Sequence, residues 1–401
     1  MITLSRFRYI LACIILLSLF LGCARKYSVG FGTGVVKTPV NVVSIDRQRI
    51  IDSAELYLSE MPVTITAATC DRSLGGPNDL YSEGDYWWQN PENPQGPYMQ
   101  RDGMTNPDNF TDHRKAMRRM SMQVANLTAA YKVSGDKKYA DHAAKHLIAW
   151  FVNEDTKMNP HMRFAQAIMN VVPGRGVGLI DGIHLVEPAR AVTILENSGA
   201  LTRAEFNAIQ GWYATFLTWM TTHEYGIDER DRKNNHGTCW VMQAAEFARL
   251  TENEVILNYC RERYKTVLLP NQMSDDGGFF MELRRTKPYG YSLFNIDALA
   301  MVCHILSTPE NNLWAFTLDD GRGIARGMEF IVPFIADKST WNLKPDVMYW
   351  DQWPVRQPSL LFAGMSLGNQ SYIDLWKTLK PVPETEEGLR NFPIREPVLW
   401  F

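Results

Sequence analysis

The chain has 401 residues, which is enough for one large domain or two ordinary ones. Hydrophobic residues make up 45% of the sequence and charged residues 21%, a balance typical of a globular protein. The formal net charge of −3 shows no basic excess, so nucleic acid is not expected as a partner.

The first residues of the chain have the pattern of a targeting segment. Arg6 and Arg8 are followed by an apolar run that ends at Leu21 and is too short to span a membrane comfortably. Cys23 follows shortly after, and the pattern resembles a bacterial lipoprotein signal with Cys23 as the lipidated first residue of the mature protein. We therefore expect residues 1–23 to be a signal peptide and the protein to be periplasmic, anchored to the membrane by lipid. A plain cleaved signal peptide is the alternative.

Helical patterns dominate the rest of the chain. Residues 24–45 carry few structural signals and are predicted to be a tether, and residues 47–61 have the pattern of an amphipathic helix. Residues 115–151 predict an αα-hairpin, that is, two helices separated by the break Ser134-Gly135-Asp136. Further helices are expected at about residues 183–197, 202–222, 237–250, 253–268, 291–306, 321–336 and 369–379.

Strand-like alternation is nearly absent, and helical hairpins follow one another through most of the chain. This pattern predicts an all-α fold, a helical toroid or a bundle array, with residues 46–380 as a single domain. Residues 381–401 are rich in proline and are predicted to form a C-terminal tail that packs on the surface of this domain.

Two connecting segments are rich in aromatic and charged residues. Residues 81–114 form a long loop, and residues 274–291 join two of the predicted helices. Long ordered loops in compact domains are often functional. The first segment contains Tyr86, Trp87, Trp88, Tyr98 and Arg101. The second contains Glu282, Arg284, Arg285, Lys287, Tyr289 and Tyr291.

The helix predicted to start at Gly237 is preceded by Asn234, Asn235 and His236. Asparagine suits the cap position, where its side-chain oxygen satisfies free backbone N–H groups. Capping needs one asparagine and no histidine, so it leaves an amide and an imidazole side by side without an explanation. Taken alone, His236 would more often be a structural imidazole than a functional one.

Asn, His, Arg and Tyr side chains together suit one kind of chemistry. The sequence has no GxSxG motif, no P-loop and no zinc-binding cysteine spacing, and no cofactor is expected. β-Elimination from a uronic acid requires neutralisation of the sugar carboxylate, which Arg, His and an Asn amide achieve by hydrogen bonding. A base then removes the hydrogen at C5, and an acid protonates the leaving O4. Tyrosine can take either role, and adjacent cations lower its pKa.

Four segments resemble the alginate lyase superfamily of helical-toroid polysaccharide lyases, in the order in which that family has them. They lie between about residues 80 and 300 and comprise SEGDYWWQNP…GPYMQRDGMTNP…HR, MNPHMRFAQAI…GRGVGLID, NNHGTCWVMQ and DDGGFFMELRRTKPYGYSLFN. The resemblance implies an (α/α) toroid, which is an incomplete α/α barrel, and a catalytic domain that cleaves a uronate polysaccharide by β-elimination.

The same resemblance implies roles for single residues. Asn235 and His236 match the family's Asn-His pair, which neutralises the uronate carboxylate, and the histidine can also serve as base. Arg285 matches the arginine of the ELxR stretch, which lies close to the carboxylate and the catalytic tyrosine. Tyr291 matches that tyrosine.

Arg284 and Tyr289 are rivals for the roles of Arg285 and Tyr291, because the arginine-to-tyrosine spacing is one residue shorter than in some members of the family. Tyr289 is also a candidate for substrate binding. Further candidates for substrate binding are Trp87, Trp88, Tyr98, Arg101, Asn159, His161, Gln166 and Arg175. The alternative is that these side chains pin a loop or make structural polar contacts.

A metal site is not expected. His142 and His146 are four residues apart on a predicted helix, a spacing that metal ligands can have. No third ligand is near them in sequence, so we interpret them as part of a solvated polar helix face. Asp275 and Asp276 resemble a calcium loop only loosely and are predicted to form a turn.

These observations predict a lyase that cleaves alginate, with mannuronate-rich stretches as the expected substrate, and leaves 4,5-unsaturated uronate ends. In mannuronate the C5 hydrogen and O4 lie on the same side, so Tyr291 can act as both base and acid. In guluronate they lie on opposite sides, so His236 would be the base and Tyr291 the acid. Glucuronan or another polyuronate is the alternative substrate.

Two other classes of function stay open on the sequence. One is a glycoside hydrolase, which needs two carboxylates across the scissile bond. The candidates for such a pair are Asp85, Asp276 and Glu282. The other is a non-catalytic, glycan-binding lipoprotein.

Overall fold

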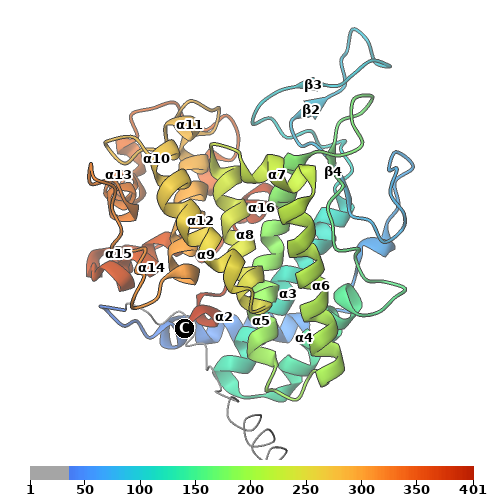
Figure 1. Ribbon diagram of the computed structural model, residues 1–401, viewed down its shortest axis with the longest axis horizontal. Helices are drawn as coiled ribbons and strands as arrows, with labels where there is room; N and C mark the ends of the chain where they lie inside the picture. Colours follow the sequence, from blue (N-terminus) through green and yellow to red (C-terminus); the bar gives the residue numbers. More distant parts are fainter. Residues whose placement is uncertain (1–35) are drawn as a thin grey trace, which may run out of the picture.

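The structure is a computed structural model that describes residues 36–401 (Figure 1). The predicted signal peptide, with its Cys23, and the first part of the predicted tether lie outside these residues. Helix α2 (Val42–Tyr57) starts inside the predicted tether. It does so because the Asn41 side chain accepts a hydrogen bond from the Ser44 backbone N–H, at 3.0 Å, and caps the helix.

Helices α3 (Asp112–Ser134) and α4 (Lys137–Phe151) form the predicted αα-hairpin and pack against each other. Gly135 ends α3 with a left-handed backbone at φ 76°, a conformation that glycine adopts without strain. The Asp136 side chain then caps α4 by accepting a hydrogen bond from the Lys138 backbone N–H. The turn chemistry seen in the sequence therefore produces this hairpin.

The other predicted helices are present, with ends shifted by a few residues. They are α5 (Val186–Leu195), α6 (Arg203–Thr222), α8 (Asn235–Leu250), α9 (Glu254–Arg263), α12 (Pro288–Leu306), α13 (Ile324–Ala336) and α15 (Gln370–Thr378). Five further helices were not expected from the sequence pattern: α7 (Glu224–Arg230), α10 (Leu269–Gln272), α11 (Phe280–Leu283), α14 (Pro358–Leu367) and α16 (Glu386–Arg390). The predicted all-α fold class is confirmed.

Within residues 36–401, no helix combines the length and the apolar character that crossing a membrane requires.

Four short strands form two small sheets near one end of the helices (Figure 1). Strand β1 (Tyr81–Glu83) pairs in parallel with β4 (Phe164–Ala167). Strand β2 (Trp87–Trp88) pairs antiparallel with β3 (Met99–Gln100), so the long predicted loop folds back on itself as a hairpin. In Figure 1, β2, β3 and β4 lie at the same end of the molecule as α7 and α11.

Helices α8 and α12 pack against each other in the core. Every residue of α12 from Tyr291 to Leu306 is buried, and α8 is buried over nearly its whole length. A helix that is apolar on all sides is stable only when other elements surround it. The first turns of these two helices carry Asn235, His236 and Tyr291, so a rigid core supports the predicted site residues.

The two histidines of α4 are buried, so the prediction that they lie on a solvated helix face was wrong. His142 is 5% exposed and His146 is 0% exposed. The segment after α2 crosses this face, where His142 Nε2 lies 2.8 Å from the Glu60 carbonyl oxygen and the Trp150 indole donates to the Val63 carbonyl. Sequence periodicity misplaced these histidines because the covering segment is remote in sequence.

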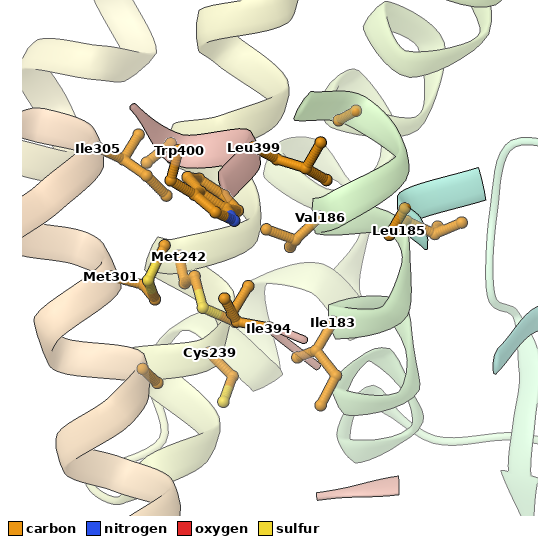
Figure 2. Close-up of a cluster of buried hydrophobic side chains, with 14 of the residues drawn as sticks. Ile183, Leu185, Val186, Cys239, Met242, Met301, Ile305, Ile394, Leu399 and Trp400 are labelled. Atoms are coloured by element: carbon orange, nitrogen blue, oxygen red, sulfur yellow. The ribbon is translucent and has the colours of Figure 1, made fainter. Parts of the chain in front are cut away.

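Residues 392–400 of the C-terminal tail are buried, whereas Pro381, Glu384 and Glu386 are exposed, so the prediction of a surface segment at residues 381–401 is corrected for its last part. Ile394, Leu399 and Trp400 are buried among side chains of η2 (Gly176–Leu185), α5, α8 and α12 (Figure 2). Glu187 on α5 accepts hydrogen bonds from two consecutive backbone N–H groups of the tail, each at 2.8 Å. The tail is thus part of the core, and helix α16 in it reaches the site described next.

Candidate active site

A cavity of about 140 Å³ opens where the loop after β1, the first turns of α8 and α12, and α16 meet. All four residues with predicted catalytic roles line it. The lining includes Asp85, Tyr86, Trp87, Gln100, Gln166, Arg175, Asn235, His236, Arg285, Tyr291, Arg390 and Asn391. Three of these side chains are arginines and one is a carboxylate, so the cavity suits a negatively charged ligand.

Asn235 occupies the first turn of α8 and is 3% exposed. The expectation that an asparagine side chain caps this helix was wrong, because Asn234 stands at the cap position and its side chain makes no capping hydrogen bond. Instead, Glu282 Oε1 accepts from the Asn235 backbone N–H at 2.6 Å. The Asn235 side-chain Nδ2 is buried without a partner among the described residues, which leaves an amide donor for a ligand oxygen.

His236 is held by a carboxylate that the sequence analysis missed. Its Nδ1 lies 2.7 Å from Oε1 of Glu229, a residue of α7 that is 0% exposed. Because Nδ1 is engaged, Nε2 is the ring nitrogen left for chemistry in the cavity.

Arg285, rather than Arg284, lines the cavity. Arg284 is exposed, with its guanidinium near the Phe280 ring. The Arg285 guanidinium donates to both carboxylate oxygens of Asp102, at 2.8 and 3.3 Å, and lies 4.2 Å from the centre of the Tyr291 ring. Asp102 belongs to the loop between β3 and α3, so this loop fixes the arginine beside the tyrosine.

Tyr291, rather than Tyr289, lines the cavity. The Tyr291 and Tyr86 hydroxyl groups are hydrogen-bonded at 2.8 Å. Tyr289 is 0% exposed, donates its hydroxyl to the Phe334 carbonyl at 3.1 Å and packs beside Trp341. The suggestion that Tyr289 is a rival catalyst or a substrate-binding residue is therefore corrected, because its hydroxyl is hydrogen-bonded to a backbone carbonyl inside the core.

The pKa of the Tyr291 hydroxyl is raised well above its ordinary value. Burial is the largest cause, the neighbouring Tyr86 adds to it, and the Arg285 cation opposes it. The adjacent Arg285 cation does lower this pKa, as expected, but burial outweighs the arginine and the net shift is upward. The phenol of Tyr291 keeps its proton at neutral pH in the free protein.

A buried charge network supports the tyrosine pair from behind. Asp85 accepts from Arg114 at 2.8 Å and from Arg390 at 2.7 Å, and Arg390 reaches the Tyr86 hydroxyl at 3.5 Å. Burial raises the pKa of the Asp85 carboxyl, but the two guanidinium groups outweigh it and bring the pKa to about 2. Arg390 comes from α16, so the C-terminal tail supplies a charge to the site.

Three of the residues predicted to bind substrate lie in the cavity wall. Trp87 and Gln166 line it together with Arg175, whose guanidinium donates to the Gln166 side chain at 3.2 Å and lies near the Trp87 ring. Burial lowers the pKa of Arg175 to about 10, so the cation persists at neutral pH. Gln166 has a left-handed backbone at φ 50°, a conformation that non-glycine residues adopt mostly where surroundings enforce it.

Besides Tyr289, five of the residues predicted to bind substrate lie outside the cavity. Arg101 stacks over Trp88, whose indole donates to the Met104 carbonyl, and Tyr98 is half-buried in the same loop. Asn159 donates to Asp79 at 2.7 Å, and His161 Nε2 lies 3.2 Å from the same carboxylate. These contacts agree with the alternative reading, in which Trp88 and Arg101 hold their own loop in place and Asn159 and His161 make structural polar contacts.

Several residues of the site gave no sequence signal that we recognised. They are Asp102, Glu229, Arg390 and Asn391. Glu282 was noted in its segment, but its hydrogen bond to the Asn235 backbone was not expected. Tyr86 was noted in the long loop but received no role. Across residues 36–401, no group of three or more His, Cys, Asp or Glu side chains is placed to hold a metal ion.

A helical fold with an Asn–His pair, an arginine and a tyrosine around one cationic cavity defines a polysaccharide lyase of the helical-toroid class. The family model described as Alginate lyase matches residues 64–341, which is more than half of the chain. The protein belongs to the alginate lyase family and is a polysaccharide lyase. No curated protein sequence compared with the chain matches it significantly.

Solved structures agree with this assignment. An alginate lyase from Bacteroides ovatus is 29% identical, with a TM-score of 0.78, over 89% of this chain and 93% of that one. Alginate lyase A1-III from Sphingomonas species A1 is 14% identical, with a TM-score of 0.54, over 88% of this chain and 94% of that one. A variant of A1-III complexed with a tetrasaccharide is 13% identical, with a TM-score of 0.57, over 93% of this chain and 98% of that one. The A1-III structures bear on the fold alone, and the predicted (α/α) toroid is confirmed.

Proposed function

We propose that the protein cleaves alginate, chiefly in mannuronate-rich stretches, by β-elimination and leaves 4,5-unsaturated uronate ends. The observation that carries the proposal is the convergence of Asn235, His236, Arg285 and Tyr291 on one cationic cavity. The solved structure from Bacteroides ovatus, which is named as an alginate lyase, supports the choice of alginate.

The first requirement of the reaction is neutralisation of the substrate carboxylate. The free amide donor of Asn235 and the charge of Arg285 lie in the cavity wall, beside the ring nitrogen Nε2 of His236. Hydrogen bonds from these groups to the carboxyl oxygens stabilise the enolate that forms when C5 loses its proton. A buried, cationic wall makes these bonds stronger than they would be in water.

The second requirement is proton transfer at C5 and O4. For mannuronate, both atoms face the same side, so we assign both transfers to Tyr291. The reaction needs the phenolate, so Tyr291 first releases its proton to water; the Tyr86 hydroxyl, 2.8 Å away, then donates a hydrogen bond to the phenolate oxygen, and Arg285 over the ring stabilises its charge. The phenolate takes the proton from C5. Tyr291 then returns a proton to O4 as the glycosidic bond breaks.

Glucuronan is the alternative substrate on which these residues would perform the same chemistry. Glucuronate differs from mannuronate at C2 and shares its arrangement at C4 and C5.

The carboxylates around the cavity disfavour a hydrolase. Among the described residues that line it, Asp85 is the one carboxylate, and two arginines hold it. Asp276 is exposed and Glu282 lies beneath Asn235, so no carboxylate pair faces the cavity.

The test follows near-ultraviolet absorbance while the purified protein is mixed separately with polymannuronate, polyguluronate and glucuronan. The unsaturated product absorbs and a hydrolysis product does not. A rise that is fastest on polymannuronate supports the proposal, and a faster rise on glucuronan would replace its substrate. Folded protein that gives no rise on any of the three would contradict the proposal.

We also propose that the protein is a periplasmic lipoprotein anchored through Cys23, a proposal that rests on the N-terminal sequence pattern. Replacing Cys23 with serine should release the protein from the membrane fraction. Unchanged fractionation of this variant would contradict the anchor.

A further inference from the structure

A second cavity, of about 150 Å³, lies beside the candidate active site, and the two linings have no described residue in common. Its charged lining residues are the cations Arg232, Lys233 and Arg263 and the carboxylate Asp231. Three cations and one carboxylate give this wall a net charge of +2, whereas the whole chain has a formal net charge of −3. A concave surface of one sign of charge attracts ligands of the other sign, so this cavity suits an anion.

Two of the three cations have capacity left for a ligand. Lys233 is exposed and forms no ion pair among the described residues. Arg263 donates to the Asp231 carboxylate at 2.8 Å and to the Arg230 carbonyl at 2.6 Å, but its Nε is buried with no hydrogen-bond partner among the described residues. A buried donor without a partner is costly, and an oxygen atom of a bound anion would satisfy it.

An irregular turn of helix shapes one wall of the second cavity. Residues Tyr264–Leu268 (η3) form a π-helical turn between α9 and α10. Arg263, directly before this turn, and Val267, within it, both line the cavity. Single π-helical turns are rare and occur frequently at functional sites. The wall therefore differs from an ordinary solvated helix face.

The buried Gln272 side chain connects the second cavity to the catalytic one. It lines the second cavity, and its amide nitrogen donates to the carbonyl of Asn234, the residue before Asn235, at 3.1 Å. Its oxygen accepts from the Thr238 hydroxyl at 2.9 Å and from the Asn295 amide at 3.0 Å. These bonds fix the side chain, so the two cavities keep a constant position relative to each other.

Positive charge extends from one cavity to the other. Lys233 precedes Asn235 by two residues, so their Cα atoms are at most about 8 Å apart. Burial, followed by the cation of Arg232, lowers the pKa of Arg175 in the catalytic cavity, so the two guanidinium groups interact. In Figure 1, α7 and α10 lie toward the same end of the molecule as β2 and β3. A polyanion held in the catalytic cavity can therefore reach the second one.

We propose that the second cavity binds the carboxylate of a uronate unit that lies a few sugars away from the unit being cleaved, and that it is a distal subsite for the polymer. This inference rests on the proposed function and adds a binding site to it. A polyuronate carries one carboxylate on every sugar, so a chain held in the catalytic cavity offers further anions at regular intervals. Lys233 and Arg263 bind this carboxylate by charge-assisted hydrogen bonds.

The first test compares Lys233→Ala with Lys145→Ala on oligomannuronates of increasing length. Lys145 is the matched control, because it is also exposed, forms no ion pair among the described residues and lines neither cavity. Lys233→Ala should raise KM by about two- to fivefold on long oligomannuronates and on the polymer, the effect of removing one exposed charge pair. Its kcat, and its KM on the shortest substrates that are cleaved, should not change. Lys145→Ala should match the wild type at every length.

Two further readouts separate a charge contact from a structural role of Lys233. Lys233→Arg keeps the charge and should keep the wild-type KM. The difference in KM between the wild type and Lys233→Ala on the polymer should shrink as salt is added, because salt screens exposed charges. A difference that salt does not change would contradict binding by charge.

Lysine acetylation followed by mass spectrometry measures occupancy of the second cavity directly. In Tyr291→Phe, in which the substrate should stay intact, a long oligomannuronate should protect Lys233 and leave Lys145 reactive. Inorganic phosphate at the same concentration of charge should protect neither lysine. Protection of Lys233 by phosphate but not by the oligomannuronate would show a site for a free anion and overturn the inference.

The kinetic outcomes distinguish this inference from the proposed function. An unchanged KM of Lys233→Ala on the polymer, or an equal rise at every substrate length, would overturn the distal subsite and leave the proposed function standing. A wild-type protein that cleaves no polyuronate would overturn the proposed function and this inference with it.

Discussion

Replacing Tyr291 with phenylalanine removes one hydroxyl group from the cavity and leaves the ring in place. If this hydroxyl transfers the proton to O4, the variant loses general acid catalysis, a contribution of about 10²- to 10⁴-fold in kcat. That loss corresponds to about 3–5 kcal/mol of transition-state stabilisation. The free energy of unfolding should fall by only about 1 kcal/mol, because Tyr86 keeps Arg390 as a neighbour at 3.5 Å.

Tyr289→Phe is the matched control, since it is the same substitution two residues away. Its hydroxyl donates to the Phe334 carbonyl in the core, so the change leaves a buried acceptor unpaired and should cost about 1–3 kcal/mol of stability. Its activity should stay within about twofold of the wild type. Initial rates from near-ultraviolet absorbance and unfolding in urea measure the two effects.

The crossed pattern is the result that tests the assignment. Tyr291→Phe should be inactive and nearly as stable as the wild type, while Tyr289→Phe should be active and less stable. Full activity in Tyr291→Phe would refute the assigned acid. Loss of activity in Tyr289→Phe, with its fold intact, would refute the placement of that residue outside the chemistry.

Two further predictions concern the groups that hold the site. Asp102→Ala should lower kcat about tenfold, because Arg285 loses the partner that orients it. The free energy of unfolding should change little, since this ion pair is partly exposed. An unchanged kcat would show that Asp102 does not position the arginine. For Asp85, the fall in pKa from 3.8 to about 2 corresponds to about 2 kcal/mol of stability, present above about pH 4 and lost as the pH falls through about 2. In urea unfolding, Asp85→Asn should therefore be less stable than the wild type at pH 7, and a deficit that does not shrink below pH 4 would contradict this.

The sequence was sufficient to predict the parts of the fold that local patterns encode. The α3–α4 hairpin follows from helical periodicity and from Gly135 and Asp136 in the turn. The site residues near the starts of α8 and α12 were predicted from residue chemistry and a family resemblance, and the structure places Asn235 and Tyr291 in one cavity. These features depend on residues that are close together in the chain.

The missed parts depend on contacts between distant segments. Glu229 lies on α7, a helix of seven residues that is too short to show a periodic pattern. Tyr86 meets Tyr291 across 205 residues, and Arg390 meets Asp85 across 305. The prolines of the C-terminal tail suggested a surface segment, yet the apolar residues between them fill the core, and no local rule distinguishes the two cases.

Elimination in this cavity would break a glycosidic bond without adding water. The most direct measurement is the mass of the fragments released from a defined mannuronate oligosaccharide by the wild-type protein and by Tyr291→Phe. We expect the wild type to release fragments whose combined mass equals that of the substrate, since no water is added, and the variant to release almost none. Fragments whose combined mass includes one water for each cut would show hydrolysis and contradict the account.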